Sequence, residues 1–170
     1  MQILVEKARQ GDGKAFAELM QNHMQSMYKV AKAILWSDED IADVIQDTIF
    51  SCWRNLNRLK DNRYFKTWMT RILINHCKDH IKNQKPHLSE EFMTEVGAND
   101  STLENVEWKE TLKLLDEKYR LIMILYYIEG FRTSEIGLIL DIPEATVRTR
   151  LARGREKLAK IYDTNEGRAL

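Results

Sequence analysis

Residues 133–158 read TSEIGLILDIPEATVRTRLARGREKL, and this stretch decides the fold. Its pattern predicts a short helix from Thr133 to Leu140, a tight turn, and a basic helix opened by Pro143. Proline suits the first helical position because its φ is preset and its missing N–H has no intrahelical partner there. With a preceding helix expected from Tyr119 to Ile128, the order predicts a helix-turn-helix.

The basic helix has two faces. Its apolar side, expected to rest on the rest of the domain, carries Val147, Leu151, Gly154 and Leu158. The opposite side has Arg, Thr and Ala, which are side chains that read base edges and thymine methyls in the major groove. We expect DNA-base contacts from Ala145, Arg148, Thr149, Ala152 and Arg153, and phosphate contacts from Arg150, Arg155 and Lys157. The alternative is a solvated basic helix that ends a bundle.

Composition and periodicity predict an all-α protein. Apolar residues make up 44% of the 170 residues, with only 2 Pro and 7 Gly, and apolar side chains recur at helical spacing, which disfavours a β sandwich or a βαβ array. No apolar run is long enough to cross a membrane. Cys52 and Cys77 lie within helical patterns, and no secretory segment precedes them, which predicts a reduced, cytoplasmic protein.

The charges are segregated along the chain. The formal net charge is zero, which by itself speaks against DNA binding. However, residues 57–85 carry eight Lys or Arg and two acids, and residues 143–160 carry six and two. Residues 36–47 carry five acids and no base, and residues 86–110 carry seven acids and one base. The chain therefore has two basic segments and two acidic segments, whose charges cancel in the net value.

The pattern predicts two small helical domains, residues 1–85 and 103–163, joined by an acidic flexible linker at 86–102 and followed by a frayed tail at 164–170. In the first domain, a helical block from Ile3 to Trp36 is interrupted at residues 11–13. Ser37 is expected to cap the next helix, and a further helix is expected from Tyr64 to Gln84, closed by Pro86.

That last helix carries a second signal for nucleic acid. Four polar residues fall on one stripe, and Tyr64 and Trp68 lie beside it. Single-stranded DNA stacks on aromatic rings for about 1–3 kcal/mol per base while its backbone follows the positive charges. With the polar loop before the helix, the expected single-strand site comprises Asp61, Asn62, Arg63, Tyr64, Trp68, Arg71, Asn75, Lys78 and Lys82. Core packing is the alternative for Trp68, and it is our expectation for Phe65, Met69, Ile72 and Leu73.

Catalysis and metal binding find little support in the sequence. His76 and His80 have the i, i+4 spacing of metal ligands, but no carboxylate or Cys-x-x-Cys supplies the remaining ligands, which favours a structural role. No Ser/His/Asp order, phosphate-binding glycine loop or Glu-x-x-His pair occurs. We therefore expect no enzyme activity, no cofactor or metal, and no small-molecule substrate.

Taken together, the motifs resemble the extracytoplasmic-function (ECF) group of bacterial RNA polymerase sigma factors. Residues 40–48 with 53–56 resemble the region 2 helix that docks on the polymerase clamp, and residues 65–72 with Asn75 and Asp79 resemble the promoter-melting helix. Residues 128–130, 135–136 and 143–153 resemble region 4. The departures from the family pattern are Gly137, Ala145 and Gly154, and a glycine inside the last helix is expected to bend or fray it.

The resemblance implies partners and roles. Region 4 would read the minus-35 element as duplex, and region 2 would open the minus-10 element and bind it as single strand. Asp40, Asp43, Gln46 and Asp47 would contact the clamp of core RNA polymerase. The alternative for these four residues is a solvated acidic face. The chain would also contact the flap of the polymerase. An anti-sigma protein would restrain the chain, in some cases at the inner face of the membrane.

Two other functions compete with this interpretation. A stand-alone helix-turn-helix activator would leave the acidic and aromatic helices of the first half without a role. A helical adaptor that binds only proteins would leave the basic face from Arg148 to Arg155 unexplained.

Overall fold

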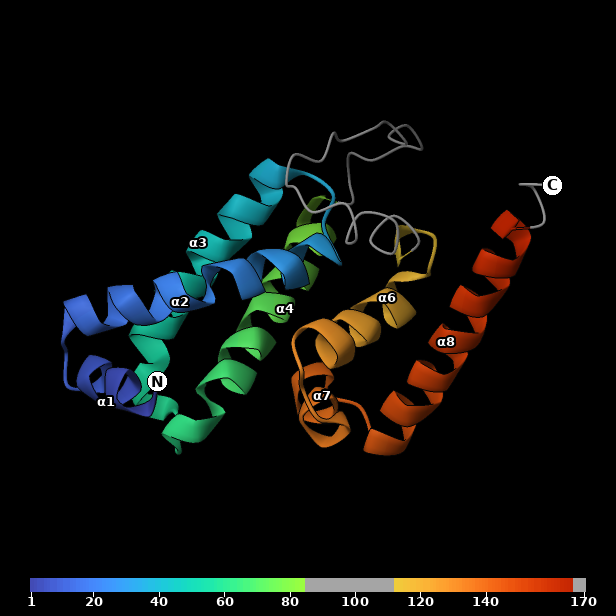
Figure 1. The fold of residues 1–170 in the computed structure, drawn as a ribbon. Helices are drawn as coiled ribbons and strands as arrows, with labels where there is room; N and C mark the ends of the chain where they lie inside the picture. The colour runs from blue at the N-terminus through green and yellow to red at the C-terminus, as the bar shows by residue number, and fades with distance from the viewer. Residues whose placement is uncertain (85–111, 167–170) are drawn as a thin grey trace.

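The computed structural model describes residues 1–84 and 112–166, which form helices joined by short turns, with no strand in these two ranges (Figure 1). This confirms the all-α prediction. The helices are α1 (Gln2–Arg9), α2 (Gly13–Lys32), α3 (Asp38–Asn55), α4 (Phe65–Gln84), α6 (Glu117–Met123), α7 (Thr133–Leu140) and α8 (Glu144–Glu166). The predicted linker at 86–102, Pro86, and the start of the second domain at 103 lie outside the described residues.

Local capping signals set the helix starts in the first half. Gly11 has a φ of 91°, and Asp12 accepts the backbone N–H groups of Lys14 at 3.0 Å and Ala15 at 3.1 Å. Ser37 Oγ accepts the N–H of Asp40 at 3.3 Å and opens α3. Both predicted boundaries are therefore confirmed.

Two boundaries differ from the prediction. The first block ends at Lys32 instead of Trp36, because the chain tightens there: the N–H groups of Ala33 and Ile34 bond to carbonyls three residues back, at 3.2 and 2.9 Å. The polar loop predicted at 59–63 is shorter in the structure, because it lies between two 3-10 turns, η1 (Leu56–Arg58) and η2 (Asn62–Tyr64), and the second includes its last two residues.

The core of the first half lies between α2, α3 and α4. Phe65 is 1% exposed and its ring lies 5.5 Å from that of His23. Fully burying a side chain of this kind stabilises the fold by about 1.5–3 kcal/mol. The core packing predicted for Phe65, Met69 and Leu73 is confirmed, while Trp68 and Ile72 are half-buried at its edge. Cys52 and Cys77 are free thiols, and burial raises the pKa of each to about 12.

The helix-turn-helix comprises α7, a three-residue turn and α8. Asp141 ends α7 in the left-handed region with a φ of 56°, and the N–H of Ile142 donates to the carbonyl of Gly137 at 3.0 Å. The Thr133 hydroxyl donates to the Glu144 carboxylate at 2.6 Å, which ties the start of α7 to the start of α8. Pro143 directly precedes α8, one residue before its predicted place inside the helix.

The helix expected from Tyr119 to Ile128 changes type along its length. Its first part is α6, and Ile124–Ile128 forms a π-helical turn, η4. The N–H of Glu129 bonds to the carbonyl of Ile124 at 3.0 Å, five residues back. This wider turn leaves Tyr126 and Tyr127 exposed, with their rings edge to face at 4.9 Å.

Helix α8 runs further than the sequence predicted. The expected fraying after Gly154 does not occur, because the helix continues to Glu166, and Leu158 and Ile161 pack against the core. The predicted frayed tail at 164–170 is therefore wrong for its first three residues, and 167–170 lie outside the described residues. Gly154 is buried where α8 crosses α6, and an added Cβ would lie 3.2 Å from Met123 Sδ.

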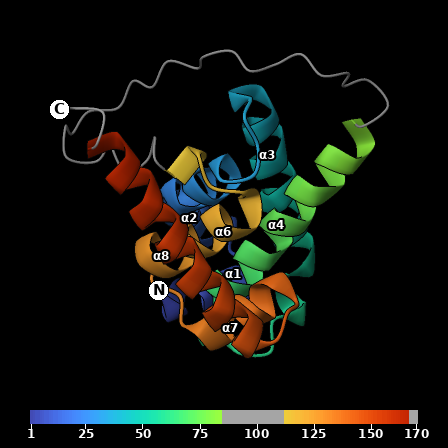
Figure 2. The ribbon, with the colours of Figure 1, turned by 90° about the vertical axis from the view of Figure 1, so that its right-hand side faces the viewer.

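The two helical groups are packed against each other. Helix α4 lies between α2 and α3 on one side and α6 and α7 on the other, with α8 on the far side of α6 (Figures 1 and 2). The contacts between the groups run from α4 to α7 and from α2 to η4. None of the helices in the described part of the chain is long and apolar enough to cross a membrane.

Gly154 provides a test of the α6–α8 packing. Leucine at this position should lower the free energy of unfolding by about 1–3 kcal/mol, because the added atoms have no room beside Met123. Alanine should change it less, because better helix propensity of about 1 kcal/mol offsets the closer contact. Urea unfolding followed by circular dichroism measures both. Gly13→Leu is the control, since nothing lies within 4 Å of a Cβ at that helical glycine; equal losses at both positions would contradict the packing argument.

Candidate nucleic-acid interface

Helix α8 has the two faces that the sequence predicted. Val147, Leu151 and Gly154 are buried against α6 and α7, and Leu158 is partly buried. Among the residues predicted to contact bases, Ala152 is half-buried. The other four are exposed: Ala145, Arg148, Thr149 and Arg153. Glu144 accepts from Arg148 at 2.7 Å, and the pKa of this carboxyl is lowered, first by the Thr133 hydroxyl and then by Arg148. The guanidinium of Arg148 is thereby held at the start of the helix.

The residues predicted to contact phosphates lie beside that face. Arg150 is half-buried, and Arg155 and Lys157 are exposed. Arg155 donates to the hydroxyl of Tyr127 at 3.1 Å, so the exposed ring of η4 extends the basic surface. Tyr127 was not identified from the sequence, since its place beside α8 depends on the π-helical turn.

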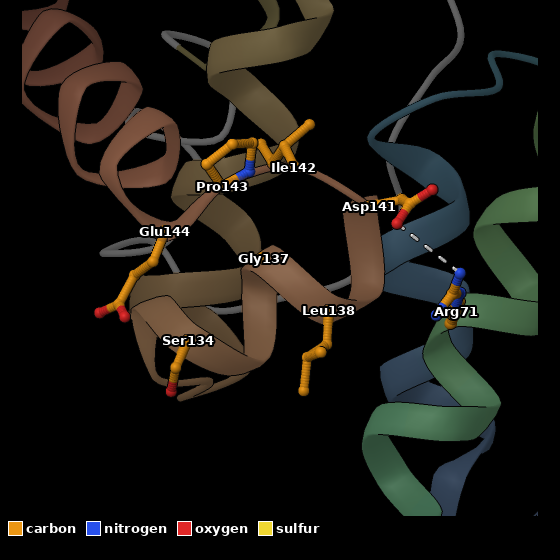
Figure 3. Close-up of a pocket in the computed structure, with 8 residues that line it drawn as sticks. All are labelled: Arg71, Ser134, Gly137, Leu138, Asp141, Ile142, Pro143 and Glu144. Carbon is orange, nitrogen blue, oxygen red and sulfur yellow. Dashed lines mark ion pairs between the residues drawn. The ribbon is translucent and has the colours of Figure 1, made fainter.

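The predicted basic stripe is exposed along α4, at Arg71, Asn75, Lys78 and Lys82. Tyr64 is 48% exposed at its entrance. Arg71 lies opposite the end of α7, 4.0 Å from the carboxylate of Asp141, at the edge of an open groove of about 520 Å³ whose other lining residues come from α7, the turn after it and the start of α8 (Figure 3). The stripe therefore starts at the junction between the groups.

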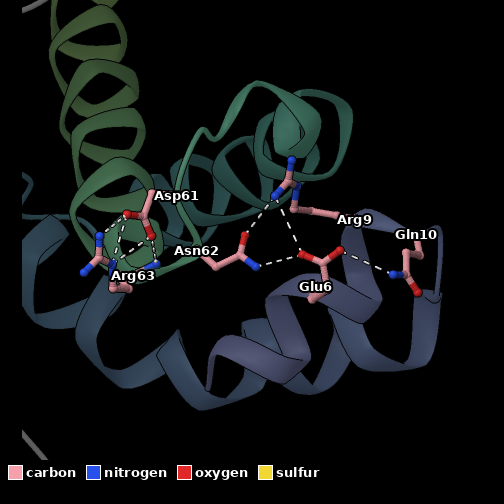
Figure 4. Close-up of polar contacts among 6 residues, drawn as sticks. All are labelled: Glu6, Arg9, Gln10, Asp61, Asn62 and Arg63. Atoms are coloured by element: carbon pink, nitrogen blue, oxygen red, sulfur yellow. Dashed lines mark hydrogen bonds and ion pairs between the residues drawn. The ribbon is translucent and has the colours of Figure 1, made fainter.

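The loop before α4 is held by two sets of polar contacts (Figure 4). Asp61 accepts the N–H of Arg63 at 2.9 Å and its guanidinium at 2.7 Å, and the Arg63 side chain lowers the pKa of that carboxyl. Asn62 instead bonds to α1, donating to Glu6 at 2.9 Å and accepting from Arg9 at 3.1 Å. The two α1 residues were not identified from the sequence, which gives no signal for a contact across more than fifty residues.

The acidic face predicted on α3 is only partly free. Asp43, Gln46 and Asp47 are exposed, whereas Asp40 faces α4, with its carboxylate 2.9 Å from His80 Nε2, and accepts from Gln84 at 3.2 Å. An apolar groove between α2 and α3 adjoins Gln46, and Phe50, which is 58% exposed, stands at its edge. Phe50 lies off the core stripe of α3, which is the signal that could have identified it.

The two histidines of α4 contact α3. His76 Nε2 lies 2.8 Å from the hydroxyl of Ser51, and His80 Nε2 lies 2.9 Å from the carboxylate of Asp40. These contacts join two neighbouring helices of the first half, as the structural interpretation of both residues predicted.

Glu129 connects the two helical groups. Its side chain is 5% exposed, and its carboxylate lies 3.1 Å from the ammonium of Lys66 on α4 and accepts from the hydroxyl of Ser26 on α2. Lys66 also donates to the backbone carbonyl of Glu129 at 2.8 Å and lies 4.8 Å from the centre of the Phe131 ring. His23 lies beside this cluster, and its pKa is lowered. Burial is the main cause and the charge of Lys66 the second, while the charge of Glu129 acts in the opposite direction.

Arg120 makes a second connection between the groups. It is buried on α6, and its Nε donates to the carbonyl of Ala33, just after α2, at 2.8 Å. Its Nη1 donates to the carbonyl of Leu115 at 3.0 Å, and its guanidinium lies 4.9 Å from the centre of the Trp36 ring. Burial lowers the pKa of Arg120, but backbone carbonyls replace the water that it has lost.

Both helical groups match models of known families. Residues 19–87 match Sigma-70 region 2, and residues 106–158 match Sigma-70 region 4. The chain is 30% identical to the ECF RNA polymerase sigma factor SigW of Bacillus subtilis, over 92% of this chain and 93% of that protein. The chain belongs to the ECF RNA polymerase sigma factors. This family is not a class of enzymes.

Other relatives of this sigma factor agree with the assignment. The ECF RNA polymerase sigma-E factor of Escherichia coli K12 is 27% identical over 92% of this chain and 91% of its own. Among solved structures, CnrH, in complex with the cytosolic domain of CnrY, matches with a TM-score of 0.73, 26% identity, and coverage of 96% and 97%. The sigma factor RpoE of Bartonella quintana, bound to the anti-sigma factor NepR, shares the fold with a TM-score of 0.75 at 19% identity, over 88% of this chain and 98% of its own.

Removing the Glu129 carboxylate should loosen the packing of the two halves of this sigma factor. In Glu129→Ala, the ammonium of Lys66 loses its buried partner, and we expect the free energy of unfolding to fall by about 1–3 kcal/mol. This loss is smaller than for a fully buried pair, because Lys66 keeps partial access to water. Hydrogen exchange should become faster in α7 while α3 stays protected. Glu156→Ala, at an exposed position of α8, is the control. Unchanged exchange in α7 would mean that the carboxylate does not hold the halves together.

Proposed function

We propose that this chain directs core RNA polymerase to a set of promoters and helps to open them. The observation that supports this most is the presence of two exposed basic surfaces in one chain, one on α8 and one on α4, together with an acidic face on α3. We assign residues 1–85 to core docking and the minus-10 element, and residues 103–163 to the minus-35 element. The chemistry of RNA synthesis belongs to the core enzyme, so the chain itself needs no catalytic group.

Helix α8 is proposed to enter the major groove of the minus-35 element. Arg148 and Arg153 have the side chains that bind guanine edges, and Ala145, Thr149 and Ala152 are small enough to contact thymine methyls. Arg150, Arg155 and Lys157 would contact the flanking phosphates, which position the helix without reading the sequence. Tyr127 supports this arrangement because its hydroxyl holds the guanidinium of Arg155.

The α4 stripe and the loop before it are proposed to bind the minus-10 element as single strand. Unstacked bases would meet Tyr64 and Trp68, and the strand would follow Arg71, Asn75, Lys78 and Lys82. Asp61, Asn62 and Arg63 would form the polar wall of this site. Arg71 faces Asp141 across the junction of the two helical groups. Both side chains are exposed, so a DNA phosphate would compete with Asp141 for the guanidinium of Arg71.

Core polymerase is proposed to dock on α3 through its clamp, with the flap contacting the second half. Asp43, Gln46 and Asp47 form the exposed acidic part of this surface, and Asp40 contributes from its edge. The exposed ring of Phe50 and the apolar groove beside Gln46 would add a nonpolar contact. A charged rim around an apolar centre is the usual composition of a protein interface.

Control by an anti-sigma protein is part of the proposal. It is supported by the fold shared with RpoE, which was solved bound to the anti-sigma factor NepR. A role on RNA polymerase would assign the chain to the cytoplasm, and attachment to the inner face of the membrane would occur only through such a partner.

The two competing functions account for less. A stand-alone helix-turn-helix activator uses only the part that matches region 4, and a protein-only adaptor has no use for the basic face of α8. Run-off transcription with purified core polymerase, with and without this chain, on a pool of bacterial promoters distinguishes the three. Promoter-specific transcripts that need the chain are expected; their absence with active core enzyme would overturn the proposal.

The two arginines of α8 should behave differently on the minus-35 element. Arg153→Ala removes a base contact and should lower the affinity for duplex by about 1–3 kcal/mol while relaxing the preference for the selected sequence. Arg155→Ala removes a phosphate contact and should weaken binding to all sequences alike. Gel-shift titrations on selected and scrambled duplexes measure both effects. Equal losses on both duplexes for Arg153→Ala would show that its side chain does not read bases.

Charge reversal on α3 tests the docking surface. Asp43→Lys with Asp47→Lys should reduce binding to core polymerase and reverse its salt dependence, because the altered face would repel a basic partner. Both positions are exposed, so the circular dichroism spectrum should not change. Glu18→Lys with Glu156→Lys, at exposed positions of α2 and α8, controls for the change in net charge. Wild-type affinity in a pull-down would indicate that this face is merely solvated.

A further inference from the structure

Helix α1 lies outside the part of the chain that matches region 2, which begins at residue 19. Nevertheless, α1 contacts both η1 and η2, the two short turns that precede α4. Figure 4 shows the polar side of this contact, with Glu6 and Arg9 pointing toward Asn62. A helix beyond the matched region therefore touches the loop that we assign to the minus-10 strand.

The contact uses both polar atoms of the Asn62 amide. Its Nδ2 donates to Glu6 Oε2 at 2.9 Å, and its Oδ1 accepts from Arg9 Nη1 at 3.1 Å. The two α1 side chains also lie 3.7 Å apart as an ion pair, and the bond from Asn62 is the main cause of the lowered pKa of Glu6. Two bonds to one planar amide fix its orientation as well as its position.

Holding Asn62 determines what the loop presents to solvent. Asn62 is the first residue of η2, and Arg63 and Tyr64 come directly after it. Both of these side chains are exposed, and the Arg63 guanidinium lies 5.9 Å from the centre of the Tyr64 ring. A cation beside an exposed ring is suited to a stacked base and its phosphate.

We propose that α1 is a positioning element for promoter opening: Glu6 and Arg9 hold Asn62 so that Arg63 and Tyr64 face the minus-10 strand. Asn62 is then a positioning residue instead of a base contact, because its amide is already bonded to α1. This inference rests on the proposed function of the loop. It adds a role for a helix that the region 2 match does not include.

A mutant cycle tests the proposal with the full chain bound to core polymerase. Glu6→Ala with Arg9→Ala releases Asn62, and Asn62→Ala removes the amide that they hold. Each should slow open-complex formation by about tenfold, the scale of two lost hydrogen bonds. Because all three residues act through one contact, combining the changes should cost no more than either alone. The relative use of the four bases at each minus-10 position should shift in the same way in all these variants.

Controls separate positioning from folding. Lys7→Ala with Glu18→Ala removes one charge of each sign from exposed positions of α1 and α2 and should change the rate less than twofold. Glu6→Gln keeps an acceptor for the Asn62 amide and should retain most of the activity. Binding to the minus-35 duplex should stay as in the wild type, and thermal unfolding should remain one cooperative transition above the assay temperature, which shows that the variants are folded.

The possible outcomes are distinct. If Asn62→Ala slows opening but the α1 double variant does not, the inference is wrong and the assignment of the loop stands. If the α1 effect multiplies with that of Asn62→Ala, or base use does not shift, α1 merely supports the fold and the inference is again wrong. If Asn62→Ala has no effect, the inference is wrong, while the minus-10 role of the loop is tested separately, by alanine at the exposed Arg63 and Tyr64.

Discussion

The buried carboxylate of Glu129 imposes a constraint that much of the structure satisfies. A charge that has lost its water needs partners at close range, and Glu129 finds them on two helices of the other half, in Lys66 and Ser26. Those partners can reach it only if α2 and α4 lie side by side and the chain after η4 turns toward them. The position of the helix-turn-helix relative to the first half therefore depends on this cluster, with Arg120 anchoring the other end of the contact.

The same cluster divides the cations of the molecule into two groups. Lys66 and Arg120 are engaged in contacts between the halves, so they add little to the electrostatic field that DNA experiences. The cations on α8 and those of the outer α4 stripe remain at the surface. A chain with a formal net charge of zero can thus present two positive surfaces, because its charges are separated in space as well as in sequence.

The sequence predicted interactions between residues close together in the chain and missed those between residues far apart in it. The interruption at residues 11–13, the cap at Ser37 and the two faces of α8 follow from residues a few positions apart, and these predictions hold. The bonds from α1 to Asn62 and from Lys66 to Glu129 join residues 56 and 63 positions apart, and no local pattern signals them. Asp40 shows the intermediate case. Periodicity placed it outside the core of its own helix, but the neighbouring α4 supplies His80 as its partner.

The π-helical turn at Ile124–Ile128 has a consequence for how this chain tolerates changes in length. A π turn holds one more residue than the α turn that could replace it. Deleting a residue there would let an ordinary α turn form, and because each kind of turn completes one revolution, the residues on either side would keep their faces. Glu129 comes directly after the turn, so it would stay on the Lys66 side of the helix. The π turn is therefore a place where the chain can lose one residue, whereas a deletion inside α7 or α8 would rotate everything beyond it by about 100°.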